Sequence, residues 1–68
     1  MVGKRRLTKP TLGIAMEAGI AVTVPPGQAV DIVTTPIYGE RTVDVLWNGQ
    51  KLMMFVSDLE DRSQEIDS

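Results

Sequence analysis

The dipeptide Asn48-Gly49 constrains the fold of this chain more than any other feature, because it is the preferred pair for a hairpin turn of type I′. Apolar and polar residues alternate on both sides of it, over residues 41–47 and 50–56. Such a tight turn sets the register of the flanking strands, and it pairs Trp47 with Gln50, Val45 with Leu52 and Val43 with Met54. We therefore expect a long antiparallel hairpin that turns these side chains toward one face.

The opposite face of this hairpin is mixed rather than polar, since the same register pairs Leu46 with Lys51, Asp44 with Met53 and Thr42 with Phe55. Leu46, Met53 and Phe55 form a candidate interface, because methionine adapts to varied surfaces and aromatic residues often carry interface energy. In the alternative, the N-terminal segment, the loop that holds Tyr38 or a terminal helix covers them. Trp47 and Tyr38 are further candidate contacts, and burial of the Trp47 ring at the end of a barrel is the competing interpretation.

Two earlier strands are predicted by a second region of alternation. Every second residue is apolar from Leu12 to Met16 and again from Ile20 to Val24. A three-residue loop ending at Gly19 would place Met16 opposite Ile20 and keep both runs on one buried face.

Turn residues and a helix signal delimit the rest of the chain. Pro26-Gly27 suits a type II turn, and a further strand follows at Val30 and Ile32, before an irregular loop. Ser57 and Glu60 have the spacing of a capping box, which predicts one helical turn with Leu59 as its only buried residue. The residues after it are expected to be a polar tail or, alternatively, a short final strand at 64–66.

Composition removes several ways of stabilising so short a chain. The 68 residues include neither cysteine nor histidine, so disulfides and the usual zinc ligands are missing. Small domains without such links often rely on oligomerisation. Val, Ile and Thr contribute 19 of the 68 residues, which favours strands. We expect a mostly β domain that associates with itself.

The N-terminal region superficially imitates a signal peptide, with a basic start followed by the apolar run Leu12–Val24. Glu17 interrupts this run, and Pro10 and Gly13 break it further. No stretch is long enough to span a membrane. We therefore expect no signal peptide, no membrane partner and a cytoplasmic location.

The net charge of −2 hides a strong asymmetry between the two ends. The first nine residues carry +4, and residues 58–68 carry −4. Opposite ends of this kind attract one another within one molecule or join neighbouring molecules head to tail. Both arrangements remain open at this point.

Together, the expected strands, the long loop, the tight hairpin and the helical turn resemble an SH3-like small β-barrel. The stretch Val43–Arg62, with Val-x-Val-x-Trp, Asn48-Gly49, Phe55 and Asp58-Leu59, is similar to the closing strands of such barrels, and the chain is also similar to short uncharacterised bacterial proteins. The resemblance implies an all-β, five-stranded barrel over residues 11–66 with one helical turn near its C-terminal end. Residues 1–10 would then be a basic arm and residues 67–68 a polar tail. The fold by itself implies no activity.

The sequence gives little support for a catalytic site. Without histidine or cysteine, the commonest general base and the best side-chain nucleophile are both missing. Ser57, Lys51 and the carboxylates of Asp58 and Asp61 lack a motif that would place them for catalysis, and the carboxylates lack the spacing of a calcium loop. We expect no enzyme, no metal and no cofactor.

Two functional hypotheses follow. The first is a non-catalytic protein-interaction or assembly module that binds a protein partner or itself, as a homo-oligomer, through the Leu46, Met53 and Phe55 face. The alternative is a small nucleic-acid-binding barrel that contacts phosphates through four basic residues, Lys4, Arg5, Arg6 and Lys9. The sequence pI of about 4.8 argues against the alternative, because nucleic-acid-binding domains are usually basic.

Overall fold

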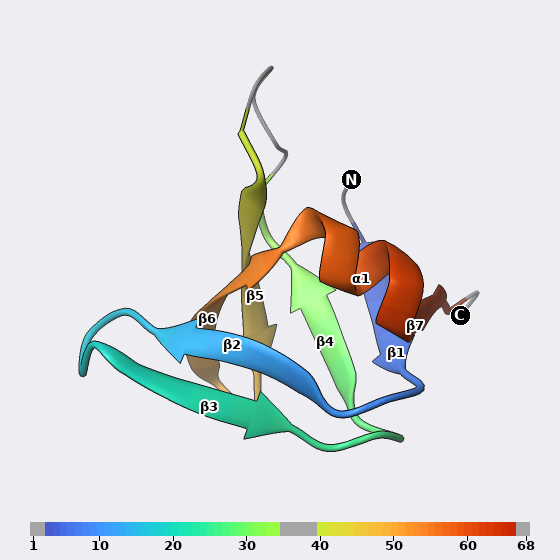
Figure 1. Cartoon of the computed structure of the whole chain (residues 1–68), viewed down its shortest axis with the longest axis horizontal. Coiled ribbons are helices and arrows are strands. Elements are labelled where there is room, and N and C mark those ends of the chain that lie inside the picture. The colour runs from blue at the N-terminus through green and yellow to red at the C-terminus, as the bar shows by residue number, and fades with distance from the viewer. Residues whose placement is uncertain (1–2, 35–39, 67–68) are drawn as a thin grey trace.

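A computed structural model describes residues 3–34 and 40–66 of the chain. It contains, within this range, seven antiparallel strands and one short helix: β1 (Gly3–Leu7), β2 (Thr11–Ala15), β3 (Ile20–Val24), β4 (Ala29–Ile32), β5 (Thr42–Trp47), β6 (Gln50–Phe55), α1 (Val56–Arg62) and β7 (Ser63–Glu65). The strands form one sheet in the order β3-β2-β6-β5-β4-β1-β7, which curls into a half-barrel (Figure 1). The all-β class is confirmed, but the predicted count of five strands is wrong, because β1 and β7 join the five expected ones.

The central hairpin has the predicted register throughout. Strands β5 and β6 pair from Thr42↔Phe55 to Trp47↔Gln50. Asn48 and Gly49 both have positive φ, at 51° and 76°, as a type I′ turn requires. The inward side chains are at most 2% exposed, namely Val43, Val45, Leu52 and Met54. This hairpin therefore supplies the middle of the core.

The predicted faces of β2 are wrong. Ala15 rather than Met16 lies opposite Ile20, so that the connection has four residues instead of three. Gly19 has φ 68°, and its N–H donates to the carbonyl oxygen of Ala15 at 2.7 Å. This shift of one residue turns Thr11, Gly13 and Ala15 inward, and it turns Leu12, Ile14 and Met16 away from the core.

Close approach between β2 and β6 explains the inverted face. A Cβ atom added to Gly13 would lie 3.1 Å from Cδ1 of Leu52 and 3.3 Å from Cε of Met54. Even a methyl group at Gly13 would therefore require the side chains of Leu52 or Met54 to shift, and a larger side chain there would require a larger shift. The small residues take the inner face, although the apolar residues beside them are larger.

Strand β1 forms where the sequence predicted a basic arm outside the barrel. It pairs with β4 from Gly3↔Ile32 to Arg6↔Ala29 and, on its other side, with β7. Leu7 ends the strand inside the core, with 1% exposure. The basic and acidic ends of the chain are therefore neighbours within one molecule, as the first of the two arrangements proposed.

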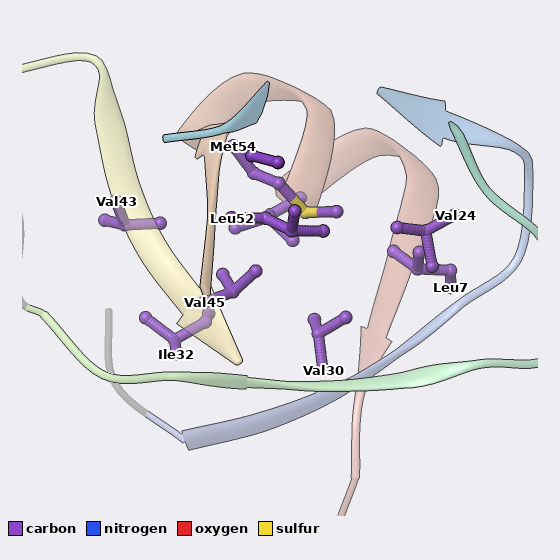
Figure 2. Packing of buried hydrophobic residues seen from close by; sticks show 10 residues of the cluster. Leu7, Val24, Val30, Ile32, Val43, Val45, Leu52 and Met54 are labelled. Carbon is purple, nitrogen blue, oxygen red and sulfur yellow. The ribbon is translucent and has the colours of Figure 1, made fainter. Parts of the chain in front are cut away.

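Helix α1 closes the concave side of the sheet. It packs against β1, β2, β6 and β7, and Leu59 is its only buried residue, as predicted. The predicted capping box is not formed, because the helix begins after Phe55 and has no side-chain cap. Figure 2 shows the core that the helix covers, where side chains from β1, β3, β4, β5 and β6 converge. No helix in the described residues is long and apolar enough to cross a membrane.

Candidate interaction surface

Five apolar side chains lie on the convex face of three adjacent strands, β2, β6 and β5. We call this set the outer patch; it consists of Leu12, Ile14, Leu46, Met53 and Phe55. Leu12, Leu46 and Phe55 are 46%, 39% and 42% exposed, respectively. Ile14 and Met53 are half-buried between them. Their clustering is unusual, since single exposed apolar residues are common on protein surfaces but contiguous groups mark binding sites.

The register of the sheet brings these side chains together. Ile14 is directly opposite Met53, which in turn is directly opposite Asp44 on the next strand. Directly opposed side chains on one face of an antiparallel pair lie close enough to pack. The outer patch thus spans β2, β6 and β5, and its Leu46 lies directly opposite Lys51 on β6 and Asp31 on β4.

An ion pair lies within this surface. Nζ of Lys51 is 3.7 Å from Oδ2 of Asp44, and the Asp44 side chain is 28% exposed. The backbone N–H of Asp44 also donates to Oγ1 of Thr34 at 2.9 Å, which fixes the strand at this point. The surface therefore presents one positive and one negative group among its apolar side chains.

The structure brings three of the predicted interface residues together and separates a fourth. Leu46, Met53 and Phe55 belong to the outer patch. Trp47 is half-buried beside the core, and its indole N–H donates to Oε1 of Gln28 at 3.2 Å. Tyr38 lies outside the described residues.

Leu12 and Ile14 are members of the outer patch that the sequence reasoning missed. Their alternation had placed them inward, with Met16. Gly13 between them was the available signal, because a glycine contributes no side chain and often marks a close approach of strands. The position of Gly13 against β6 is that close approach.

Of the three segments named as alternative covers for the hairpin face, two lie elsewhere, and the loop that holds Tyr38 lies outside the described residues. Residues 3–7 pair with β4 and β7, on the far side of the sheet from β2. Helix α1 inserts Leu59 into the core, on the concave side. Neither segment therefore covers the outer patch, whose exposed members remain accessible within the described part of the chain.

Three of the four candidate phosphate contacts bind groups of the protein itself. Arg5 donates from Nε to Oγ of Ser63 at 2.6 Å and from Nη2 to the Ser63 carbonyl at 3.2 Å. Arg6 donates from Nη1 to the carbonyl of Gly27 at 2.8 Å. Nζ of Lys4 lies 3.8 Å from Oδ1 of Asp31, and Lys9 is exposed between β1 and β2. Three of these side chains thus contact the protein's own groups, and those of Arg5 and Arg6 brace the strand ends.

Two shallow hollows indent the described surface. The first, of about 320 Å³, lies where the β2–β3 and β5–β6 turns meet. The second, of about 420 Å³, adjoins the outer patch and is lined by Glu40, Arg41, Phe55, Val56, Ser57 and Glu60. This second hollow adds depth beside the Phe55 ring.

One of the carboxylates considered for catalysis or metal binding has a partner within its own helix. Asp58 forms an ion pair with Arg62 along the helix, at 3.9 Å. No group of three potential metal ligands occurs within residues 3–34 and 40–66. Every buried side-chain nitrogen and oxygen of those residues has a hydrogen-bond partner. The outer patch is therefore the surface that carries the functional argument.

Comparison of the chain with models of known families, with curated proteins and with solved structures gives no match.

Proposed function

We propose that this chain is a non-catalytic interaction and assembly module, an SH3-like small barrel that associates with a second copy of itself through the outer patch. The observation that carries the proposal is the exposure of Leu12, Leu46 and Phe55, at 39–46%, on three adjacent strands. Contiguous apolar surface of this kind is a feature of association sites. We place the assembly in the cytoplasm, the compartment expected for a small domain without disulfides.

Association would be driven by removal of these side chains from water. Complete burial of a Leu or Phe side chain stabilises by about 1.5–3 kcal/mol, and the partly exposed members of the outer patch retain a fraction of that. Phe55 has the further advantage of a ring beside a hollow, where aromatic anchors concentrate binding energy.

The charges of the outer patch favour a second copy as the partner. Each molecule presents both Asp44 and Lys51. A two-fold axis that brings Lys51 of one copy to Asp44 of the other forms this pair twice, because the same surface is used by both copies. A surface with one charge of each sign is thus electrostatically complementary to itself.

Sedimentation velocity from micromolar to millimolar concentration tests this proposal. We expect the wild-type chain to associate reversibly, and we expect Phe55→Asp to associate clearly more weakly over the same range. Gln64→Asp is the matched control, because it adds the same charge at an exposed position of β7, away from the outer patch. A Phe55→Asp chain that dimerises as well as the wild type would contradict the role of the outer patch.

Nucleic-acid binding through Lys4, Arg5, Arg6 and Lys9 has weaker support. Arg5 and Arg6 donate to oxygens of the protein itself, and a carboxylate lies beside Lys4. Titration of fluorescent oligonucleotides at two salt concentrations tests this alternative. Binding that weakens when all four residues are replaced by alanine would favour it over protein assembly.

A further inference from the structure

Strand β3 forms an open edge of the sheet. Within the described residues it pairs only with β2, along Ile20–Val24. Its sequence, Ile-Ala-Val-Thr-Val, contains no charge and no proline, and Ile20 is 55% exposed. Natural sheets protect their edges with charged residues, prolines, bulges or very short strands, since an edge presents unpaired backbone donors and acceptors. None of these devices occurs within β3.

The sequence of β3 is self-complementary about its central residue. Antiparallel pairing of two copies about Val22 places Ile20 opposite Val24 and Ala21 opposite Thr23 of the other copy. Ile20, Val22 and Val24 share the inward face of the strand, where Val24 is fully buried and Val22 packs against the core, so the exposed Ile20 is the side chain of this face that a second copy covers most. The smaller Ala21 and Thr23 meet on the other face. No like charges oppose one another in this register.

We infer that β3 pairs with β3 of a second copy about a two-fold axis at Val22, and that this pairing joins two half-barrels into one continuous sheet. The inference rests on the proposed function only in taking a second copy as the partner. It uses the backbone edge of β3, whereas the proposed function uses side chains on the convex face. The two contacts can therefore be tested separately.

Taken alone, pairing at β3 closes after two copies. The described residues form one sheet with one such edge, and its other edge is β7, a three-residue strand of Ser, Gln and Glu. When the same edge is used by both partners, the contact is isologous and leaves no free end for a third copy. Pairing of five residues buries much less than the roughly 1,200 Å² of a standard stable interface. The β3 contact is consequently reversible and dependent on concentration.

Single cysteine variants test the inference directly, because the wild-type chain has no cysteine. Directly opposed Cα atoms of antiparallel strands lie about 4.5–5.5 Å apart, within the roughly 4.4–6.8 Å range of disulfides. We expect Val22→Cys to form a disulfide-linked dimer under mild oxidation. Gln64→Cys, on the β7 edge, is the matched control and should yield about tenfold less linked dimer, equivalent to about 1.4 kcal/mol.

A mixing experiment tests the register. Ala21→Cys and Thr23→Cys chains should form little linked dimer separately, because each cysteine lies away from the two-fold axis and meets a different residue. A mixture of the two should form the mixed disulfide. Adding Thr23→Lys to the Val22→Cys chain should reduce linkage about tenfold, since a lysine on the edge opposes pairing. Circular dichroism of each variant checks that it is folded.

The outcomes separate this inference from the proposed function. Linkage at Val22 that persists with Phe55→Asp supports the β3 contact, because that contact does not use the outer patch. A wild-type dimer without preferential linkage at Val22 overturns the β3 contact and leaves the outer patch standing. Linkage at Val22 that Thr23→Lys does not reduce also overturns it, as does a wild-type chain that is monomeric up to millimolar concentration.

Discussion

The two edges of this sheet, β3 and β7, are constructed in opposite ways. β7 has three polar residues and is held by a network at Ser63: Arg5 donates to its side chain and to its carbonyl oxygen, and the Ser63 hydroxyl donates to the carbonyl of Leu59. β3 has five uncharged residues and pairs, within the described range, only with β2. The comparison shows that one half-barrel can have one edge protected by composition and another suited to pairing. We therefore expect the composition of its edges to influence how this sheet associates.

Replacement of Leu59, which anchors α1 in the core, should have the largest effect on the β7 edge. Leu59 is fully buried and its helix leads directly into β7. Leu59→Ala should lower the free energy of unfolding by about 2–5 kcal/mol, measured by urea denaturation. Leu59→Met is the control and should cost less than about 1.5 kcal/mol. Equal losses in the two variants would show that packing volume at this position is unimportant.

Arg5→Ala should open the β7 edge specifically. It removes two hydrogen bonds to Ser63, and hydrogen bonds from charged groups contribute about 1.5–3 kcal/mol each at most. We expect the free energy of unfolding to fall by about 1–3 kcal/mol and amide exchange to become faster in β7 while it changes less in β3. Arg6→Ala is the comparison variant; it removes one exposed hydrogen bond to Gly27 and should lower the free energy of unfolding by less. Unchanged exchange in β7 would contradict the bracing role.

Making β7 resemble β3 sharpens the comparison. Combining Gln64→Val with Glu65→Val removes the polar protection of β7 while changing the stability by only about 0.5 kcal/mol, because both positions are exposed. Each molecule then has two apolar edges, so we expect larger species than the wild-type chain forms at the same concentration, measured by sedimentation velocity. A distribution identical to that of the wild type would show that edge composition does not control assembly.

The ion pair between β1 and β4 should have the smallest effect. Lys4 and Asp31 are 52% and 53% exposed and 3.8 Å apart. Lys4→Ala should change stability by less than about 1 kcal/mol, and added salt should remove most of that difference, as measured by thermal unfolding. A larger, salt-independent loss would mean that Lys4 contributes through packing.

Local turn chemistry made the central hairpin predictable from sequence. Asn48-Gly49 permits positive φ at both turn positions, and the short turn leaves little freedom in register. The same reasoning failed at β2 because Glu17–Gly19 did not specify a unique turn, and the packing of Gly13 against Leu52 decided the register instead. Tertiary packing of this kind cannot be obtained from alternation alone.

β1 was not predicted as a strand because its basic residues are typical of a solvated segment. In the fold, Arg5 is satisfied by Ser63, which is 58 residues away, and Lys4 by a carboxylate on β4. Partners so distant in sequence leave no local pattern. The candidate surface was therefore anticipated for its hairpin part, Leu46, Met53 and Phe55, whereas Leu12 and Ile14 depended on the register of β2.

The position of β1 between β4 and β7 has a consequence for folding. The β2–β3 and β5–β6 hairpins can form early, since hairpins of local sequence close in about 1–10 μs. β1 must instead find partners across the length of the chain, which is slow because distant contacts carry a larger closure entropy. Until β1 inserts, β4 is an additional open edge. In concentrated solution, the β1 segment of another molecule competes for that place, so the rate of refolding should fall and domain-swapped species should rise with protein concentration.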